Sequence, residues 1–310
     1  MRKTACAGLT LVELLVAMTI ASLVGSMVLQ MVIGFQSRIL TEVSRNDLQD
    51  RAERLIRFLA NDIREAAFLL GPVPRVAGGG SLSLVHDSLA GDPLEVLPFS
   101  IVVEDNAAGD DLLTVVKAVS FSPPICLSQP GFVGEDELVL SRFPNRSPGS
   151  TRELKPGPEA INHLALANHR TCYSVRLADL TLELNQSLLE DSPAGTEVLG
   201  VRAYTYQLDS FAGSNRLRRD DFTSREILDD AVDGMQFEYL LGDGSMVSQP
   251  SQPQDIRGVR ISLLVRDLRA DRGYTDENVY MLGNRTYGPF QDHNRRIIVS
   301  HLVEVKNHGL

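Results

Sequence analysis

The three residues of this sequence best suited to chemistry are Gly8, Leu9 and Glu13. Glu13 opens an apolar run, where a carboxylate gains from the helix dipole but costs about 2.5–3.5 kcal/mol in hydrocarbon. A charged partner would offset that cost, and a free α-amino group is the natural one. If the chain were cut after Gly8, the new amine of Leu9 would lie one helical turn from Glu13. The spacing therefore predicts a processed subunit that assembles inside a membrane.

The element that must position these residues is an apolar helix. The 24 residues from Leu14 to Ser37 carry no formal charge, and Arg38 ends the run. Such a helix spans roughly 36 Å, enough to cross a hydrocarbon core of about 30 Å. Arg2 and Lys3 precede it. By the positive-inside rule they keep the short leader in the cytoplasm, with the rest of the chain beyond an inner membrane.

Two simpler interpretations of the helix remain as alternatives. A secretory signal peptide would be cut near Ala21 or Gly25-Ser26, but the apolar run continues well past those positions. A plain signal-anchor helix would tether the chain and would leave Gly8 and Glu13 without a role.

The segment Gly8-Leu9-Thr10-Leu11-Val12-Glu13, followed by the apolar helix, resembles the class III signal of type IV prepilins and pseudopilins. The resemblance implies that a prepilin peptidase cuts after Gly8 and methylates Leu9. It also implies that Glu13 pairs with the amine of an adjacent subunit in a filament. The family usually has phenylalanine where this chain has Leu9.

Composition bounds what the rest of the chain can do. The chain has 310 residues, 43% of them hydrophobic, so it can bury a full domain core after the helix. Loss of residues 1–8 would remove two basic residues and no acid, taking the net charge from −10 to −12. Such an acidic chain lacks the basic face that nucleic-acid binding needs, so we predict no nucleic-acid partner.

The fold predicted from the pattern is α+β, a long N-terminal helix packed on an antiparallel β-sheet. The predicted segments are a leader (1–8), a transmembrane and filament-core helix (9–37), an amphipathic helix (38–71) that ends at Gly71-Pro72, and a β-rich periplasmic domain (72–310). The expected strands are 94–103, 112–121, 137–143, 172–184, 197–208, 235–241, 259–265 and 296–305.

The C-terminal part resembles PilW-type minor pilins and the related J-type pseudopilins of type II secretion. The segments that carry this resemblance are Asp233-Gly234-Met235-Gln236-Phe237-Glu238-Tyr239, then Val259-Arg260-Ile261-Ser262-Leu263, then Asn294-Arg295-Arg296. The likeness covers both ends of the chain well and residues 75–195 poorly. The basic residues of these strands are expected on an exposed face.

Cysteine usage is compatible with an exported domain. Cys6 would leave with the leader, whereas Cys126 and Cys172 remain where a disulfide could form. A Cys126–Cys172 bridge is predicted, and two separate buried thiols are the alternative.

No catalytic set stands out, so no enzyme activity, cofactor or metal is expected. The histidines show no metal spacing, and His163 and His169 are expected on the surface. The acid pairs Asp220-Asp221 and Asp229-Asp230 are expected in solvent. Gly242-Asp243-Gly244 offers too few oxygens for calcium and is predicted to be a β-turn.

These observations favour a minor type IV pilin that primes assembly at the pilus tip, because its domain is bulky for a shaft subunit. The partners implied are prepilin peptidase, other minor pilins, the major pilin and an inner-membrane assembly platform. The alternatives are a tip pseudopilin of type II secretion and a membrane-tethered periplasmic binding domain. Loss of Glu13 should abolish assembly in the pilin classes and leave a tethered domain working.

Overall fold

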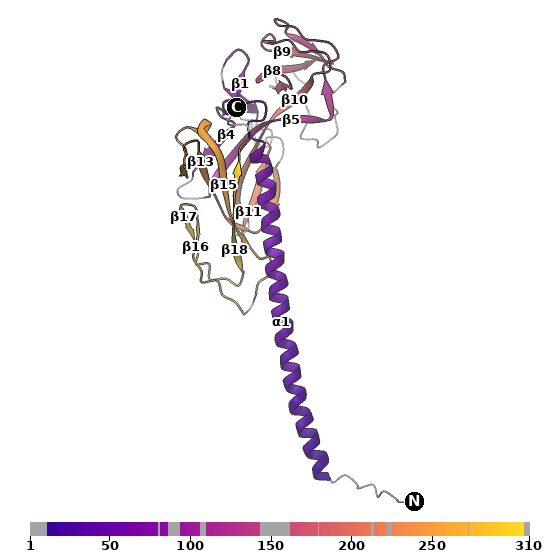
Figure 1. Cartoon of the computed structure of the whole chain (residues 1–310), viewed down its shortest axis with the longest axis vertical. Helices are drawn as coiled ribbons and strands as arrows, with labels where there is room; N and C mark the ends of the chain where they lie inside the picture. Colours follow the sequence, from indigo (N-terminus) through magenta and orange to yellow (C-terminus); the bar gives the residue numbers. More distant parts are fainter. Residues whose placement is uncertain are drawn as a thin grey trace, which may run out of the picture. The chain divides into compact units, whose positions relative to one another are not determined.

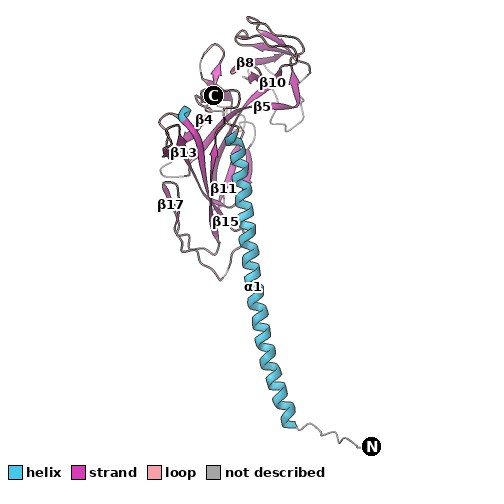
Figure 2. Ribbon diagram, in the orientation of Figure 1, coloured by secondary structure: helices cyan, strands magenta, loops and turns pink. Residues whose placement is uncertain are grey.

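The computed structural model describes residues 11–79, 81–85, 94–105, 110–142, 162–178, 180–211, 214–221, 225–271 and 273–306. Its contacts divide the chain into two units, residues 1–50 and residues 51–310. One long helix, α1 (Leu11–Arg64), begins in the first unit and ends in the second, which contains all the described strands (Figures 1 and 2). The predicted α+β class is confirmed.

The strands lie between residues 75 and 304. Their bounds are β1 (Arg75–Val76), β2 (Leu82–Val85), β3 (Leu94–Leu97), β4 (Ile101–Glu104), β5 (Leu112–Cys126), β6 (Glu137–Val139), β7 (Asn162–Leu166), β8 (Thr171–Ala178), β9 (Thr181–Leu184), β10 (Glu197–Phe211), β11 (Ser214–Asp220), β12 (Arg225–Asp229), β13 (Val232–Leu241), β14 (Met246–Val247), β15 (Ile256–Arg266), β16 (Tyr280–Leu282), β17 (Arg285–Tyr287) and β18 (Arg296–Glu304). A 3₁₀ turn, η1 (Pro253–Asp255), precedes β15.

The helix ends at Arg64, seven residues before the predicted end at Gly71. Ala67 and Leu69 adopt positive φ angles of 62° and 61°, which a helix does not allow. The N–H of Ala67 donates to Val116 O of β5 at 2.9 Å instead of to a helical carbonyl. The amphipathic pattern continues past Arg64 because the turn after the helix buries its apolar residues too, not because the helix continues.

The end of α1 packs on a sheet whose centre is the antiparallel pair of long strands β5 and β10. β4 extends this sheet beyond β5, and β11 and β12 extend it beyond the C-terminal half of β10. Helix residues Ala52, Leu55, Ile56, Leu59, Ala60 and Ile63 are buried. Their three- and four-residue spacing places them on one face of the helix.

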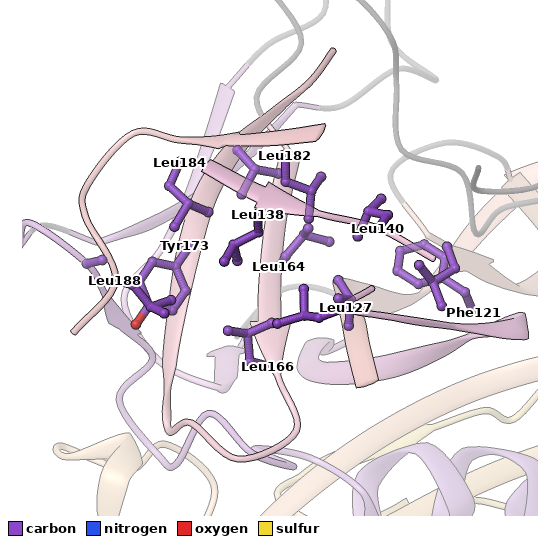
Figure 3. Packing of buried hydrophobic residues seen from close by; sticks show 14 residues of the cluster. Phe121, Leu127, Leu138, Leu140, Leu164, Leu166, Tyr173, Leu182, Leu184 and Leu188 are labelled. Atoms are coloured by element: carbon purple, nitrogen blue, oxygen red, sulfur yellow. The ribbon is translucent and has the colours of Figure 1, made fainter. Parts of the chain in front are cut away.

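The far ends of β5 and β10 contribute to a second core, and we call this part of the protein the barrel subdomain. From the start of β10 the sheet continues through β7, β8, β9 and β6. It closes when residues 139–141 return to the end of β5, with Ser128 N donating to Val139 O and Ser141 N to Cys126 O, both at 2.8 Å. Apolar side chains from all six strands fill the inside, among them several leucines, Phe121 and Tyr173 (Figure 3).

The C-terminal strands form a separate antiparallel sheet in the order β14-β13-β15-β18. Residues Val259, Ile261 and Leu263 of β15 are fully buried, and Ser262 and Leu264, which alternate with them, are buried as well. The hairpin of β16 and β17 lies over β13, where the ring of Tyr287 would be only 2.7 Å from a Cβ on Gly234. Gly242-Asp243-Gly244 forms the turn before β14, and Ser245 N donates to Asp243 Oδ1 at 2.9 Å, which confirms the predicted turn.

The predicted strand 94–103 is two strands in different sheets. β3 pairs with β2, whereas β4 pairs with β5. Pro98 lies between them and cannot donate a ladder hydrogen bond, so the chain can leave one sheet for another at this point. The predicted strand 172–184 is likewise a hairpin of β8 and β9.

Candidate assembly site

The N-terminal part of α1 presents apolar side chains on every side. Residues Leu11–Gln36 have a mean hydropathy of 2.1 and none is buried within the protein. By length and composition this segment can cross a membrane, since 26 residues of helix span about 39 Å. An apolar surface of this size is not stable in water and requires lipid or other helices around it.

The hydroxyl groups of this segment are satisfied by the helix itself. Thr19 Oγ1 donates to Val16 O at 2.8 Å, and Ser26 Oγ donates to Leu23 O at 2.8 Å. Ser22 makes the same bond to Thr19 O at 2.9 Å. Because each hydroxyl returns to its own helix, these residues lose little when water is removed.

Glu13 is the exception among these side chains. It lies in the first turn of α1, is exposed, and is the one formal charge between residues 11 and 36. The first turn is the positive end of the helix dipole, which favours a carboxylate there. Gly8 and Leu9, and with them the predicted cleavage and methylation sites, lie outside the described residues.

The other end of α1 is held by a buried charge cluster that the sequence pattern did not reveal. Asp62 accepts a hydrogen bond from Lys117 Nζ of β5 at 2.7 Å and another from the Tyr206 hydroxyl of β10. Arg219 of β11 lies 3.5 Å from Asp62 and stacks on the Phe58 ring at 4.8 Å. The helix end is thereby fixed to three strands at once.

The electrostatics of this cluster follow from burial and pairing. Burial alone would lower the pKa of Lys117, but the carboxylates of Asp62 and Glu65 outweigh it and raise the pKa. Burial, together with the Asp62 charge, raises the pKa of Tyr206 well above its usual value. Lys117 therefore stays charged and Tyr206 neutral at physiological pH. The one sequence signal was Asp62 itself, an acid beside Leu59 and Ile63 on the apolar face.

A second ion pair lies three helical turns earlier. Arg51 makes a two-pronged contact with Asp229, the last residue of β12, which is itself almost buried. Asp229 also accepts the N–H of Ala231 at 2.8 Å. A groove of about 370 Å³ lies beside this pair, lined by Arg51, Arg54, Leu55, Phe58, Leu228 and Asp229.

The structure contradicts the predicted Cys126–Cys172 disulfide, since both thiols are free. Ile125 and Leu127 point into the barrel subdomain, and so does Tyr173, so the alternation of strand side chains turns both cysteines outward. Their strands, β5 and β8, are separated by β10 and β7. Cys172 Sγ donates to Arg75 O at 3.1 Å, and burial raises the pKa of this thiol to about 12.

Several polar residues expected in solvent are buried. His163 and His169 are both buried, and His163 contacts Ser174 Oγ at 3.2 Å. Asp220, Asp221 and Asp229 are buried too, because arginines of neighbouring elements reach the first and last of them. Charge patterns along a sequence do not reveal such pairs, since the partners come from different strands.

Arg296, predicted to lie on an exposed face, is also buried. Its guanidinium contacts Asp233 at 2.6 Å, Asp276 at 2.8 Å and Asp292 at 2.6 Å. It also lies 3.6 Å from the centre of the Phe290 ring. One arginine thus joins β13, β18 and the segment between β15 and β16.

Two families match the chain. Residues 3–29 match the prokaryotic N-terminal methylation motif, a stretch that contains Gly8, Leu9 and Glu13. Residues 189–307 match the family described as type IV pilus-assembly protein W, a stretch that runs from the loop before β10 through β18. These two matches support a PilW-type type IV minor pilin. No curated protein matches it.

The two matches indicate a role for the N-terminal helix. A type IV minor pilin is processed by prepilin peptidase and assembles with other pilins, and its apolar helix anchors it in a membrane before assembly. The PilW match covers the C-terminal sheet and the long strand β10, whereas β1 to β9 lie outside it. Most of the barrel subdomain is therefore a part of this pilin that the family match does not describe.

Proposed function

We propose that this minor pilin is cut after Gly8, methylated on Leu9 and placed at or near the pilus tip, where it primes assembly. Before assembly it is a single-pass inner-membrane protein whose residues 51–310 lie in the periplasm. The observation that carries the proposal is Glu13 in the first turn of a helix that is otherwise apolar and exposed through Gln36. An adjacent amine, supplied by a cut chain, is the partner that such a carboxylate needs in hydrocarbon.

The size of the domain supports the tip position. Residues 51–310 form one contact unit whose described strands make four sheets, the largest of which also builds the barrel subdomain. A shaft subunit must pack beside copies of itself along the whole filament, whereas a subunit at the end has neighbours on one side. The match to a pilus-assembly family favours a pilus over a type II secretion filament. The inner-membrane assembly platform, the other minor pilins and the major pilin are the proposed partners, and the proposed role is structural, not enzymatic.

The test combines intact mass with a charge substitution. We expect the membrane-extracted protein to lack residues 1–8 and to carry one added methyl group only when prepilin peptidase is present. Glu13→Leu should still be cut but should abolish piliation, because the helix keeps its anchor and loses its charged contact. Glu53→Leu, on the same helix outside the apolar segment, is the matched control and should leave piliation intact.

Labelling of sheared pili tests the position of the subunit. Antibody to residues 51–310 should mark one end of each filament and not its length. An uncut chain with normal function would instead support a tethered periplasmic domain. Lost secretion with normal piliation would support a type II secretion pseudopilin.

A further inference from the structure

Two loops of the barrel subdomain lie side by side, residues 128–136 before β6 and residues 185–196 before β10. We call them the paired loops. Gly131 and Ser192 exchange two backbone hydrogen bonds, each 2.8 Å long. Gly134 N donates to Leu188 O at 3.0 Å, and Leu188 N donates to Glu135 O at 2.7 Å. Leu188 points into the inner cluster, so the paired loops are attached to the core (Figure 3).

Buried polar side chains near the end of β7 and the start of β8 form hydrogen bonds to the paired loops. His169 is fully buried, and its Nε2 lies 3.0 Å from Ser192 Oγ while its Nδ1 lies 3.0 Å from the Tyr173 hydroxyl. The same hydroxyl accepts the N–H of Leu189 at 3.3 Å. These buried groups therefore help to hold the backbone of residues 185–196 in place.

The exposed side chains of the paired loops include three large apolar ones. Phe132, Val133 and Leu189 are 54%, 61% and 55% exposed. The N–H groups of Phe132 and Val133 donate to the carboxylates of Glu135 and Asp191, at 3.0 and 2.8 Å. Since the backbone is already ordered, covering these side chains would gain apolar burial at little cost in loop entropy.

The rim of this apolar patch is acidic. The paired loops contain Glu135, Asp136, Glu190 and Asp191, all exposed, and no lysine or arginine in their sequences. Arg170 follows the buried His169 in the neighbouring turn between β7 and β8. A partner that covered the apolar patch would thus place its edge against carboxylates, which favours lysine or arginine there.

We propose that the paired loops bind a basic segment of a partner protein, which places an apolar side chain against Phe132 and Leu189 and its cationic groups beside Glu190 and Asp191. The acidic rim argues against an anionic lipid surface. Phe132 lies outside the stretch that matches the PilW family, whereas Leu189, Glu190 and Asp191 lie at the start of that stretch.

The probe is a short labelled peptide with one phenylalanine between two pairs of lysines, and its counterpart carries glutamates. Binding to the full chain in non-ionic detergent is followed by fluorescence anisotropy. We expect the lysine peptide to bind and the glutamate peptide not to bind.

Phe132→Ser/Leu189→Ser should weaken binding about tenfold, equivalent to about 1.4 kcal/mol. Glu190→Lys should weaken it by a similar factor. The control Leu268→Ser/Met281→Ser, which removes two other exposed apolar side chains, should change it less than about twofold.

Three results would overturn the proposal. The first is equal binding of both peptides, or equal loss in the control and the loop variants. The second is sedimentation that shows the wild-type chain associating with itself through Phe132 and Leu189, which would make a second copy the occupant. The third is tighter binding to phosphatidylglycerol vesicles than to the lysine peptide. A circular-dichroism spectrum of each variant shows that it is folded, and the outcome does not depend on where the pilin sits in the filament.

Discussion

At the residue scale, buried charges decide how the helix end and the C-terminal sheet are held. One cluster brings together side chains from four elements where the end of α1 packs on the sheet. Its members are Asp62, Lys117, Tyr206 and Arg219. Burying these charged groups costs solvation free energy, which their mutual contacts offset. Removing one member leaves another charge buried without its partner, so it destabilises the fold.

Removing the cation from this cluster should destabilise the protein strongly. Lys117→Met leaves Asp62 and Tyr206 buried with only the more distant Arg219 nearby, so we expect a loss of about 3 kcal/mol in the free energy of unfolding. Urea unfolding of the full chain in detergent measures it. Arg57→Met removes an exposed pair with Glu53 at 2.8 Å and should cost less than about 0.5 kcal/mol. Similar costs for the two variants would contradict this account.

The carboxylates around Arg296 predict acid sensitivity. The hydrogen bond from Arg296 lowers the pKa of Asp292 to about 2, below the value of about 3.9 expected in the unfolded chain. A lowered folded-state pKa contributes stability that is present above about pH 4 and is lost as the pH falls toward 2.

The variant Asp292→Asn isolates this contribution. Because Asp292 is about one-third exposed, we expect it to be less stable than wild type by only about 1 kcal/mol at pH 7, with the difference shrinking between pH 4 and 2. Thermal unfolding of wild type and variant over this pH range measures the stability difference at pH 7 and its change with pH. Glu277→Gln changes an exposed acid in the segment between β15 and β16 and should show no such convergence. A difference that stayed constant down to pH 2 would rule out Asp292 ionisation as the cause.

At the element scale, the hairpin of β16 and β17 depends on a glycine in β13. Tyr287 packs where a side chain on Gly234 would stand, and its hydroxyl donates to Asp110 Oδ1 at 2.7 Å and accepts from Gln236 Nε2 at 3.1 Å. The hairpin and the loop before β5 are thus joined to the C-terminal sheet through one tyrosine.

The substitution Gly234→Ala should therefore loosen this contact. A Cβ 2.7 Å from the Tyr287 ring forces the ring away, and we expect a loss of about 1–3 kcal/mol. Gly242→Ala, whose Cβ would be 3.7 Å from its nearest neighbour, should cost less than about 1 kcal/mol. Hydrogen exchange should show faster opening of β16 and β17 in the first variant only. Unchanged exchange there would mean that the hairpin is held by other contacts.

At the scale of the whole molecule, this pilin combines segments that match known families with a segment that the family matches do not cover. The methylation motif and the PilW match account for the start of the chain and for β10 to β18. Strands β5 to β9, together with the start of β10, build the barrel subdomain, which shares β5 and β10 with the main sheet and has its own core. Because the two parts share continuous strands, the added part can present the paired loops without a flexible linker.

The sequence by itself determined the N-terminal helix, its anchoring role, the α+β class and most of the long strands. Glu13 and the uncharged run are local patterns, because the one-turn period of a helix spans only a few residues. Tertiary structure decided the rest. The end of the helix depends on a hydrogen bond to β5, the free cysteines depend on the strand order, and the paired loops meet from positions about 60 residues apart. Sheet closure and burial determine which residues come into contact in these three cases, and no short stretch of sequence encodes them.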